Sequence, residues 1–332
     1  MKVPVSLIID DPAPIISVYY EHAGKSTTED GRPLVPTYSN EMLFAFCDIV
    51  EKHGIKGKYS VIPMPGNKGD IINGLEGVMK EDMHKWLTAV KTRLCPNFTI
   101  GPEMLTHHKA VDLETGNALS MNERDFAATQ TRKTLTPYIE KAVSLLNQAG
   151  FDAFGVTSPW DFGIEVEEDY QAAISEAVFN VTGKKNSWLF LRGLRNTPNA
   201  KPWIGHKEDE RTLVCIPATT TDHIWQTIDT PETSEEYVQS VADEIITKDG
   251  KGGEAVRVLE TGGYPILITH WQSLMSNGLG TGLRILEEVA RRINENLSDR
   301  VEWKSSEEIM EMVLANPADY PTPALDPKDS GI

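Results

Sequence analysis

The chain has 332 residues, which is enough for two or three small domains or for one large α/β barrel with insertions. Hydrophobic residues make up 40% and charged residues 24%, proportions that exclude a disordered, collagen-like or coiled-coil protein. The chain has 32 basic and 49 acidic residues, so its formal net charge is −17. Such a field repels phosphate backbones and anionic lipids, so we expect neither nucleic acid nor membrane as a partner and favour a small neutral or cationic substrate.

The cysteines and the start of the chain bear on its location. Cys47, Cys95 and Cys215 are far apart and form no CxxC, which indicates buried free thiols instead of disulfides or a thiolate metal site. No apolar run approaches the ~20 residues of a membrane span, and the first expected strand begins a few residues after Met1, which leaves no room for a signal peptide. We therefore predict a cytoplasmic protein, and its sequence is compatible with a homo-oligomer.

Short apolar runs recur along the chain and are separated by segments with helical periodicity. Runs of this length are typical of strands buried on both faces. The predicted strands are Val5 to Ile9, Tyr59 to Ile62, Phe98 to Ile100, Ala153 to Val156, Trp188 to Leu191, Leu213 to Ile216 and Pro265 to Ile268.

The segments between these runs predict amphipathic helices, as the apolar spacing in Ile139 to Leu146 and again in Leu286 to Leu297 shows. Strand and helix alternate about seven times, which favours a parallel sheet. We predict an α/β fold, a single-domain TIM-like (β/α) barrel of seven or eight strands, over residues 1–314. Residues 315–332 are rich in proline and polar residues and predict an extended tail.

Polar residues that are capable of catalysis follow many of the predicted strands. In a barrel the carboxyl ends of the strands meet at one mouth, where active sites form. A shared site is therefore predicted, although loops are polar in any case. The candidate residues are Asp10, Asp11, Glu103, His107, Ser158, Trp160, Asp161, Asp222, His223, Trp225 and His270.

Asp10 and Asp11 are adjacent carboxylates directly after a buried strand. Holding them close is costly unless a cation or a shared proton offsets their repulsion. Because the two side chains diverge at a strand end, one can face a metal and the other a water bound to it. The alternative is a turn or a helix N-cap whose bend is set by Pro12 and Pro14.

Glu103 and His107 have the i, i+4 spacing that places two ligands on one face if the loop turns helical. His108 and Asp112 form a competing pair with the same spacing. Either pair can also be an ordinary solvated helix face. Together with Asp11, the first pair predicts a three-ligand metal site with open positions for water, which is a catalytic arrangement.

The sequence resembles the polysaccharide deacetylases of the NodB-homology type, the family-four carbohydrate esterases, as a divergent member. Leu7 to Pro14 (LIIDDPAP) is similar to the first motif, and Thr99 to His107 aligns with the HxxxH motif with a glutamate in place of its first histidine. Lys58 to Pro63 resembles the second-strand segment, and Ile266 to His270 resembles the last motif, a strand that ends in a catalytic histidine. The resemblance extends in order over most of the chain.

This resemblance implies metal-dependent removal of an acyl group, such as acetyl, from a carbohydrate or a related substrate with a C–N bond. Asp11, Glu103 and His107 would hold one divalent ion, Asp10 would act as general base, and His270 would protonate the departing amine. Zinc is the ion that the resemblance implies. Two carboxylates among three ligands move the preference towards manganese or magnesium.

The resemblance also implies substrate contacts and shows departures from the family pattern. Thr157 or Ser158 stands where the family has the arginine that supports its base, and Pro12 replaces the usual glycine. A backbone N–H near Trp160 would stabilise the oxyanion, and Asp222 with Trp225 is the candidate for the family's Asp-Trp motif. The residues predicted to contact substrate are Trp160, Asp161, Asp222, His223 and Trp225.

Two other functions remain open at this point. A metal-free glycoside hydrolase would use two carboxylates from among Asp10, Asp161 and Glu103, and its activity would survive chelation. A catalytically inactive carbohydrate-binding barrel would use tryptophans as stacking platforms and turn nothing over. The tryptophans in question are Trp160, Trp203, Trp225 and Trp271, whereas Trp188 is expected in the core.

Overall fold

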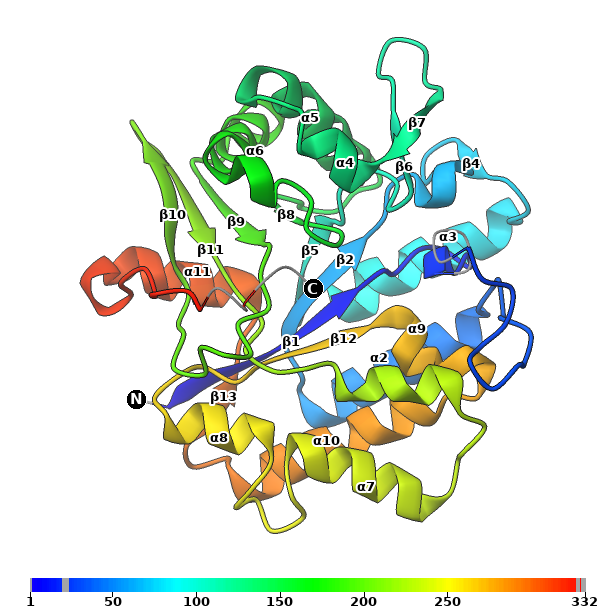
Figure 1. The fold of residues 1–332 in the computed structure, drawn as a ribbon, viewed down its shortest axis with the longest axis vertical. Coiled ribbons are helices and arrows are strands. Elements are labelled where there is room, and N and C mark those ends of the chain that lie inside the picture. The colour runs from blue at the N-terminus through cyan, green and yellow to red at the C-terminus, as the bar shows by residue number, and fades with distance from the viewer. Residues whose placement is uncertain (1, 20–23, 327–328, 330–332) are drawn as a thin grey trace.

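The computed structural model describes residues 2–19, 24–326 and 329, and every apolar run predicted as a strand overlaps with one (Figure 1). The strands are β1 (Val3–Asp10), β2 (Gly57–Val61), β3 (Gly69–Asp70), β4 (Gly74–Leu75), β5 (Phe98–Pro102), β6 (Lys109–Val111), β7 (Ala118–Asn122), β8 (Gly155–Thr157), β9 (Asn186–Phe190), β10 (Trp203–Glu208), β11 (Arg211–Cys215), β12 (Ile266–His270) and β13 (Val301–Trp303).

Both segments named above as amphipathic helices, Ile139 to Leu146 and Leu286 to Leu297, overlap with helices of the structure. The helices are α2 (Asn40–His53), α3 (Lys80–Ala89), α4 (Glu123–Ala127), α5 (Arg132–Gln148), α6 (Glu167–Thr182), α7 (Glu235–Ile245), α8 (Glu254–Glu260), α9 (Trp271–Met275), α10 (Thr281–Asn296) and α11 (Ser306–Ala315), with a 3₁₀ segment at His223–Asp229. In the part of the chain that is described, no helix combines the length and the apolar character that crossing a membrane requires.

The strands pair into two mainly parallel sheets. One has the order β12-β1-β2-β5, with β13 beside the start of β1, and the other has the order β10-β11-β9-β8, in which only β10 among these strands pairs antiparallel. An isolated bridge joins Glu103 to Thr157, and Thr219 and Ile266 exchange two hydrogen bonds of 3.0 and 2.9 Å. The predicted parallel α/β fold is confirmed.

The pairing does not show the continuous closed barrel that we predicted. Because β8 has only three residues, Gly155–Thr157, and pairs along β9, it meets the first sheet through the single bridge between Thr157 and Glu103. The hydrogen bonds therefore describe two sheets that touch along two seams. Residues from both sheets nevertheless meet at the carboxyl ends of the strands.

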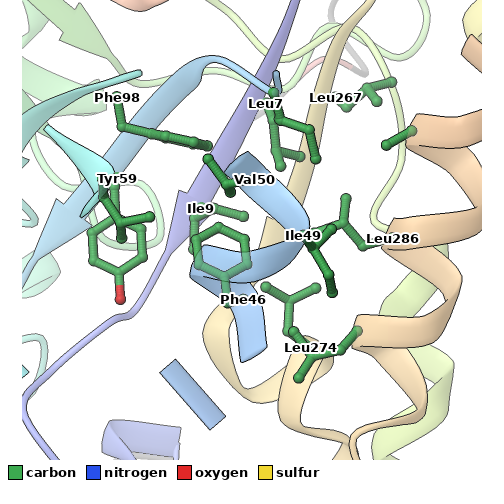
Figure 2. Packing of buried hydrophobic residues seen from close by; sticks show 14 of the residues in the cluster. Leu7, Ile9, Phe46, Ile49, Val50, Tyr59, Phe98, Leu267, Leu274 and Leu286 are labelled. Atoms are coloured by element: carbon green, nitrogen blue, oxygen red, sulfur yellow. The ribbon is translucent and has the colours of Figure 1, made fainter. Parts of the chain in front are cut away.

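The apolar core on the outer face of the first sheet fixes which residues face inward. Leu7 and Ile9 of β1 are buried among residues that include Phe46 of α2 and Leu286 of α10 (Figure 2). Since successive strand residues point to opposite faces, Asp10 is directed away from these helices. The helix packing thus turns the Asp10 side chain to the inner side of the sheet.

The inner side is filled by side chains, of which Trp188 of β9 is the largest at the junction of the sheets. Trp188 is fully buried, and its ring lies so close to Gly101 and Gly155 that a Cβ on either would sit 2.5 or 2.3 Å from ring atoms. The core position expected for Trp188 is confirmed. Glycine at both positions is what lets β5 and β8 approach this ring.

Two described residues near the C-terminus, Tyr320 and Asp329, contact distant parts of the chain. After α11 the chain forms a 3₁₀ turn at Pro317–Asp319, and the Tyr320 hydroxyl is 2.9 Å from that of Tyr264. The Asp329 carboxylate accepts hydrogen bonds from Asn196 and Thr197. The cysteines are free, as predicted, with Cys47 and Cys215 buried and Cys95 half-buried.

Candidate metal and active site

Asp11, Glu103 and His107 form a compact buried cluster at the strand ends. One ligand atom from each lies within 4.8 Å of the others, and none of the three residues is more than 3% exposed. His107 Nε2 is 2.9 Å from Asp11 Oδ1 and 3.3 Å from Glu103 Oε1. Ligands at ~2.0–2.2 Å from one ion are about 3 Å apart, so this donor set fits a divalent metal.

The charges of the cluster favour a cation at its centre. Burial and the negative charges of Asp11 and Asp10 raise the pKa of Glu103 to about 8. Burial alone would lower the pKa of His107, but Asp11 and Glu103 raise it well above its usual value. Both pKa values are raised because protonation of either group reduces the negative charge in this small volume.

The loop from Glu103 to His107 reaches this geometry without the helical turn that the i, i+4 interpretation assumed. Its backbone enters the left-handed region at Met104 (φ 37°) and again at His107 (φ 50°). The predicted ligands therefore meet because the loop folds back on itself, not because of helical spacing. The competing pair does not form: Asp112 accepts hydrogen bonds from the backbone of Glu114 and Thr115 in the turn between β6 and β7.

Glu123, at the start of α4, holds this loop in place and was not predicted. It is fully buried, and its carboxylate accepts hydrogen bonds from the backbone N–H groups of Leu105 (3.1 Å), Thr106 (3.0 Å) and His107 (2.8 Å). The Tyr138 hydroxyl donates to it as well, at 2.7 Å. Nothing in the local sequence distinguishes Glu123 from an ordinary residue in the first turn of a helix.

Asp10 and Asp11 diverge at the end of β1, as predicted. Asp11 has a φ of 68°, a left-handed conformation that aspartate tolerates better than most residues. Its backbone N–H donates to Glu103 at 2.6 Å and its carboxylate accepts from Gln272 of α9. The Asp10 carboxylate instead accepts a hydrogen bond from Lys58 of β2, which also went unpredicted as a site residue.

His270 ends β12 directly beside Asp10, with which it is paired in the strand register. Its Nδ1 is 2.8 Å from Asp222 Oδ2, and the same carboxylate accepts from Ser273 at 3.0 Å. Burial lowers the pKa of His270, but the Asp222 hydrogen bond and the charges of Asp11 and Asp10 raise it to about 9. The ring is therefore held as a cation at neutral pH.

These side chains open into one cavity of about 630 Å³. Its walls are Asp10, Asp11, Tyr19, Lys25, Glu103, His107, Ser158, Trp160, Trp225 and His270. Trp160 packs against His107 with ring centroids 4.5 Å apart, and Trp225 packs against His270 at 4.9 Å. Tyr19 meets Trp225 edge to face at 5.4 Å. Most of the predicted site residues are thus brought together.

Three residues predicted to contact substrate lie elsewhere. Asp222 sits behind His270 and caps the 3₁₀ segment that begins at His223, so its carboxylate is occupied. His223 bridges Glu244 and Glu254 at 2.7 and 2.8 Å and lines a different surface hollow. Asp161 lies 3.7 Å from an Arg124 nitrogen and is not among the described residues of the cavity wall.

The tryptophans divide between the cavity and the core. Trp160 and Trp225 line the cavity, whereas Trp203 and Trp271 are buried. Trp271 packs edge to face against Phe46 with ring centroids 5.7 Å apart. Stacking on a ligand is therefore open to the first two only, within the described part of the chain.

Comparison with known proteins supports the fold and leaves the activity open. No protein-family model matches the sequence, and no curated protein matches it. A Mycobacterium smegmatis protein described as a polysaccharide deacetylase is similar in structure, with a TM-score of 0.51 and 13% identity over 86% of this chain and 80% of that one. A glycoside hydrolase/deacetylase structure from Parabacteroides distasonis gives 0.48 at 8% identity, covering 96% and 72%. At such identities the likeness to the Mycobacterium smegmatis protein concerns the fold alone.

Proposed function

We propose that this protein is a metal-dependent hydrolase that removes an acyl group from a carbohydrate or a related small substrate with a C–N bond. The observation that carries the proposal is the convergence of Asp11, Glu103 and His107 in one cavity with a separate carboxylate, Asp10, and a histidine, His270, that is paired with Asp222. This combination supplies a metal site, a base and an acid together.

The residues divide the reaction between them. Asp11, Glu103 and His107 would hold the ion, whose chemistry in such a site is to polarise an acyl carbonyl and to lower the pKa of water. Asp10 accepts the proton of the attacking water. His270, protonated on the cavity side and oriented by Asp222, donates a proton to the departing nitrogen. His270, whose pKa is raised to about 9, thus begins the cycle with the proton that its step requires.

The walls of the cavity favour a small ligand with flat apolar faces. Trp160 and Trp225 present rings on which a pyranose ring can stack, and Lys25 adds a positive charge at the wall. A volume of about 630 Å³ accommodates a compact substrate. Zinc is the ion that the resemblance suggests, and the two carboxylates also suit manganese or magnesium.

Metal content and turnover test the proposal together. Protein purified without chelator should contain one divalent ion by elemental analysis and should release acetate from N- or O-acetylated sugars. Asp11→Ala and His107→Ala should abolish metal binding, because each removes a ligand from the cluster. Asp10→Ala and His270→Ala should retain the ion and lose ~100-fold or more in turnover.

Each outcome separates this proposal from the other functions. Activity that survives chelation would support a glycoside hydrolase. Stoichiometric metal without any turnover on acylated substrates would support an inactive binding protein. If all four variants retained the metal equally, Asp11 and His107 would not be its ligands.

A further inference from the structure

Lys58 is a charged residue at a fully buried position, the second residue of β2. Its side chain is 1% exposed and its ammonium group donates hydrogen bonds to Asp10, to Ser60 Oγ at 2.7 Å and to Thr157 Oγ1 at 2.7 Å. An ammonium group has three protons, so each has an acceptor. Ser60 and Thr157 also lie 2.9 Å apart, which closes the network.

The network joins three strands and adjoins the cluster of Asp11, Glu103 and His107. Asp10 ends β1, Lys58 and Ser60 belong to β2, and Thr157 ends β8. Thr157 is also bridged to Glu103. Lys58 therefore lies at the junction of the two sheets, and of the two adjacent aspartates it is Asp10 that accepts its hydrogen bond.

This arrangement separates the buried charges into two neutral groups. Asp11 and Glu103 together match one divalent ion, and Asp10 matches Lys58. Without Lys58, three carboxylates would compete for the ion, and a buried carboxylate without a partner is costly. Its geometry also keeps Asp10 outside the set of atoms that converge on the ion position.

We propose that Lys58 is a positioning residue that holds Asp10 out of the coordination shell of the metal and so preserves it as the base. The inference rests on the proposed function above. It predicts that removing the ammonium group releases Asp10 to become an additional ligand. The metal would then be bound at least as tightly, whereas the base would be lost.

Cobalt(II) titration of Lys58→Met tests this step, because the visible spectrum of cobalt reports the number and type of its ligands. We expect cobalt to bind with equal or higher affinity, a spectrum that differs from the wild-type one, and a fall in turnover of ~100-fold or more. The double variant Asp10→Asn/Lys58→Met should return the wild-type spectrum but not the activity. Lys58→Arg should retain the wild-type spectrum.

Lys56→Met is the matched control. Lys56 lies two residues before Lys58, is partly exposed and pairs with Glu308 at 2.9 Å on the surface. Its loss should change neither the cobalt spectrum nor turnover. If Lys58→Met does not fold, Lys58→Gln is measured by the same spectrum, since its amide retains a donor but no charge.

The outcomes separate this inference from the proposed function. A wild-type protein that binds no cobalt overturns the proposed metal site. A wild-type protein that binds cobalt, together with a Lys58 variant whose cobalt spectrum is unchanged, overturns the role of Lys58 alone. Loss of cobalt binding by folded Lys58→Met and Lys58→Gln also overturns it, because Lys58 would then support the ligands instead of restraining Asp10.

Discussion

At the scale of single residues, the site depends on carboxylates whose partners differ. Asp10 is paired with Lys58, Asp11 with His107 and Gln272, and Asp222 with His270. Chemically similar side chains therefore acquire different roles from their surroundings. In the proposed function, the base, the metal ligand and the residue that orients the acid are thus distinguished by their partners.

The pairing of Asp222 with His270 predicts how activity depends on pH. Because the pKa of His270 is raised to about 9, the ring is protonated at neutral pH, and turnover should fall as pH rises through about 9. Asp222→Asn removes the negative charge, so this alkaline limb should move down towards 6.5, the ordinary value. The measurement is a pH profile of kcat/KM for both proteins.

Asn can still accept the hydrogen bonds by which Asp222 caps the 3₁₀ segment, from Ile224 and Trp225, but its NH₂ group replaces the oxygen that pairs with His270, so the variant removes both the charge and this acceptor. Asp249→Asn, at an exposed turn, serves as the control and should leave the profile in place. An alkaline limb at the same pH in wild type and Asp222→Asn would show that His270 is not the proton donor.

Sequence motifs identified the site residues that belong to strand ends, and missed those that act from other positions. Lys58 carried a usable signal, because a lysine within an otherwise buried strand requires a buried partner. Gln272 and Glu123 carried none, since their partners lie 261 and 16 to 18 residues away in sequence. His223 and Asp161 were misplaced because adjacency in sequence does not set the direction of a side chain in a loop.

At the scale of elements, apolar runs predicted the inner strands well and could not predict the pairing at their edges. β13 consists of Val301, Glu302 and Trp303, and only its parallel pairing with the first residues of β1 makes it a strand. β10, which is not among the predicted strands, pairs antiparallel with β11. Such short strands are set by tertiary contacts and not by their own sequence.

The loop between β5 and β6 also depends on a tertiary contact, the buried carboxylate of Glu123, and this predicts the effect of Glu123→Gln. The amide group of glutamine would place its own N–H groups against one of the backbone donors of the loop, such as that of His107. His107 would then be oriented less well, and metal affinity should fall about 10–100-fold. Metal titration with an indicator dye measures this change.

Glu114→Gln, on the exposed turn between β6 and β7, is the matched control and should bind metal like the wild type. Thermal unfolding without added metal checks that Glu123→Gln remains folded. Unchanged metal affinity in a folded Glu123→Gln protein would mean that the loop keeps its geometry without this carboxylate.

At the scale of the whole molecule, the site lies where the two sheets touch. Asp11 and His270 come from the first sheet, and Thr157, which is bridged to Glu103, comes from the second. The sheets share few hydrogen bonds where they touch at this site. The interactions among the charged residues buried there therefore affect the stability of the contact between the sheets. Part of the net charge of −17 is concentrated in this cluster.

A divalent ion in the cluster should therefore stabilise the entire fold. Binding to the folded state alone adds ~2.7 kcal/mol at a ligand concentration of about 100 times Kd, which corresponds to a rise in Tm of several degrees for a protein of this size. Calorimetry with zinc, manganese or magnesium, followed by EDTA, should show a rise that the chelator reverses. Asp11→Asn should show no rise, because one ligand is lost. If Asp11→Asn were stabilised as much as the wild type, the ion would be acting on the acidic surface and not at the junction of the sheets.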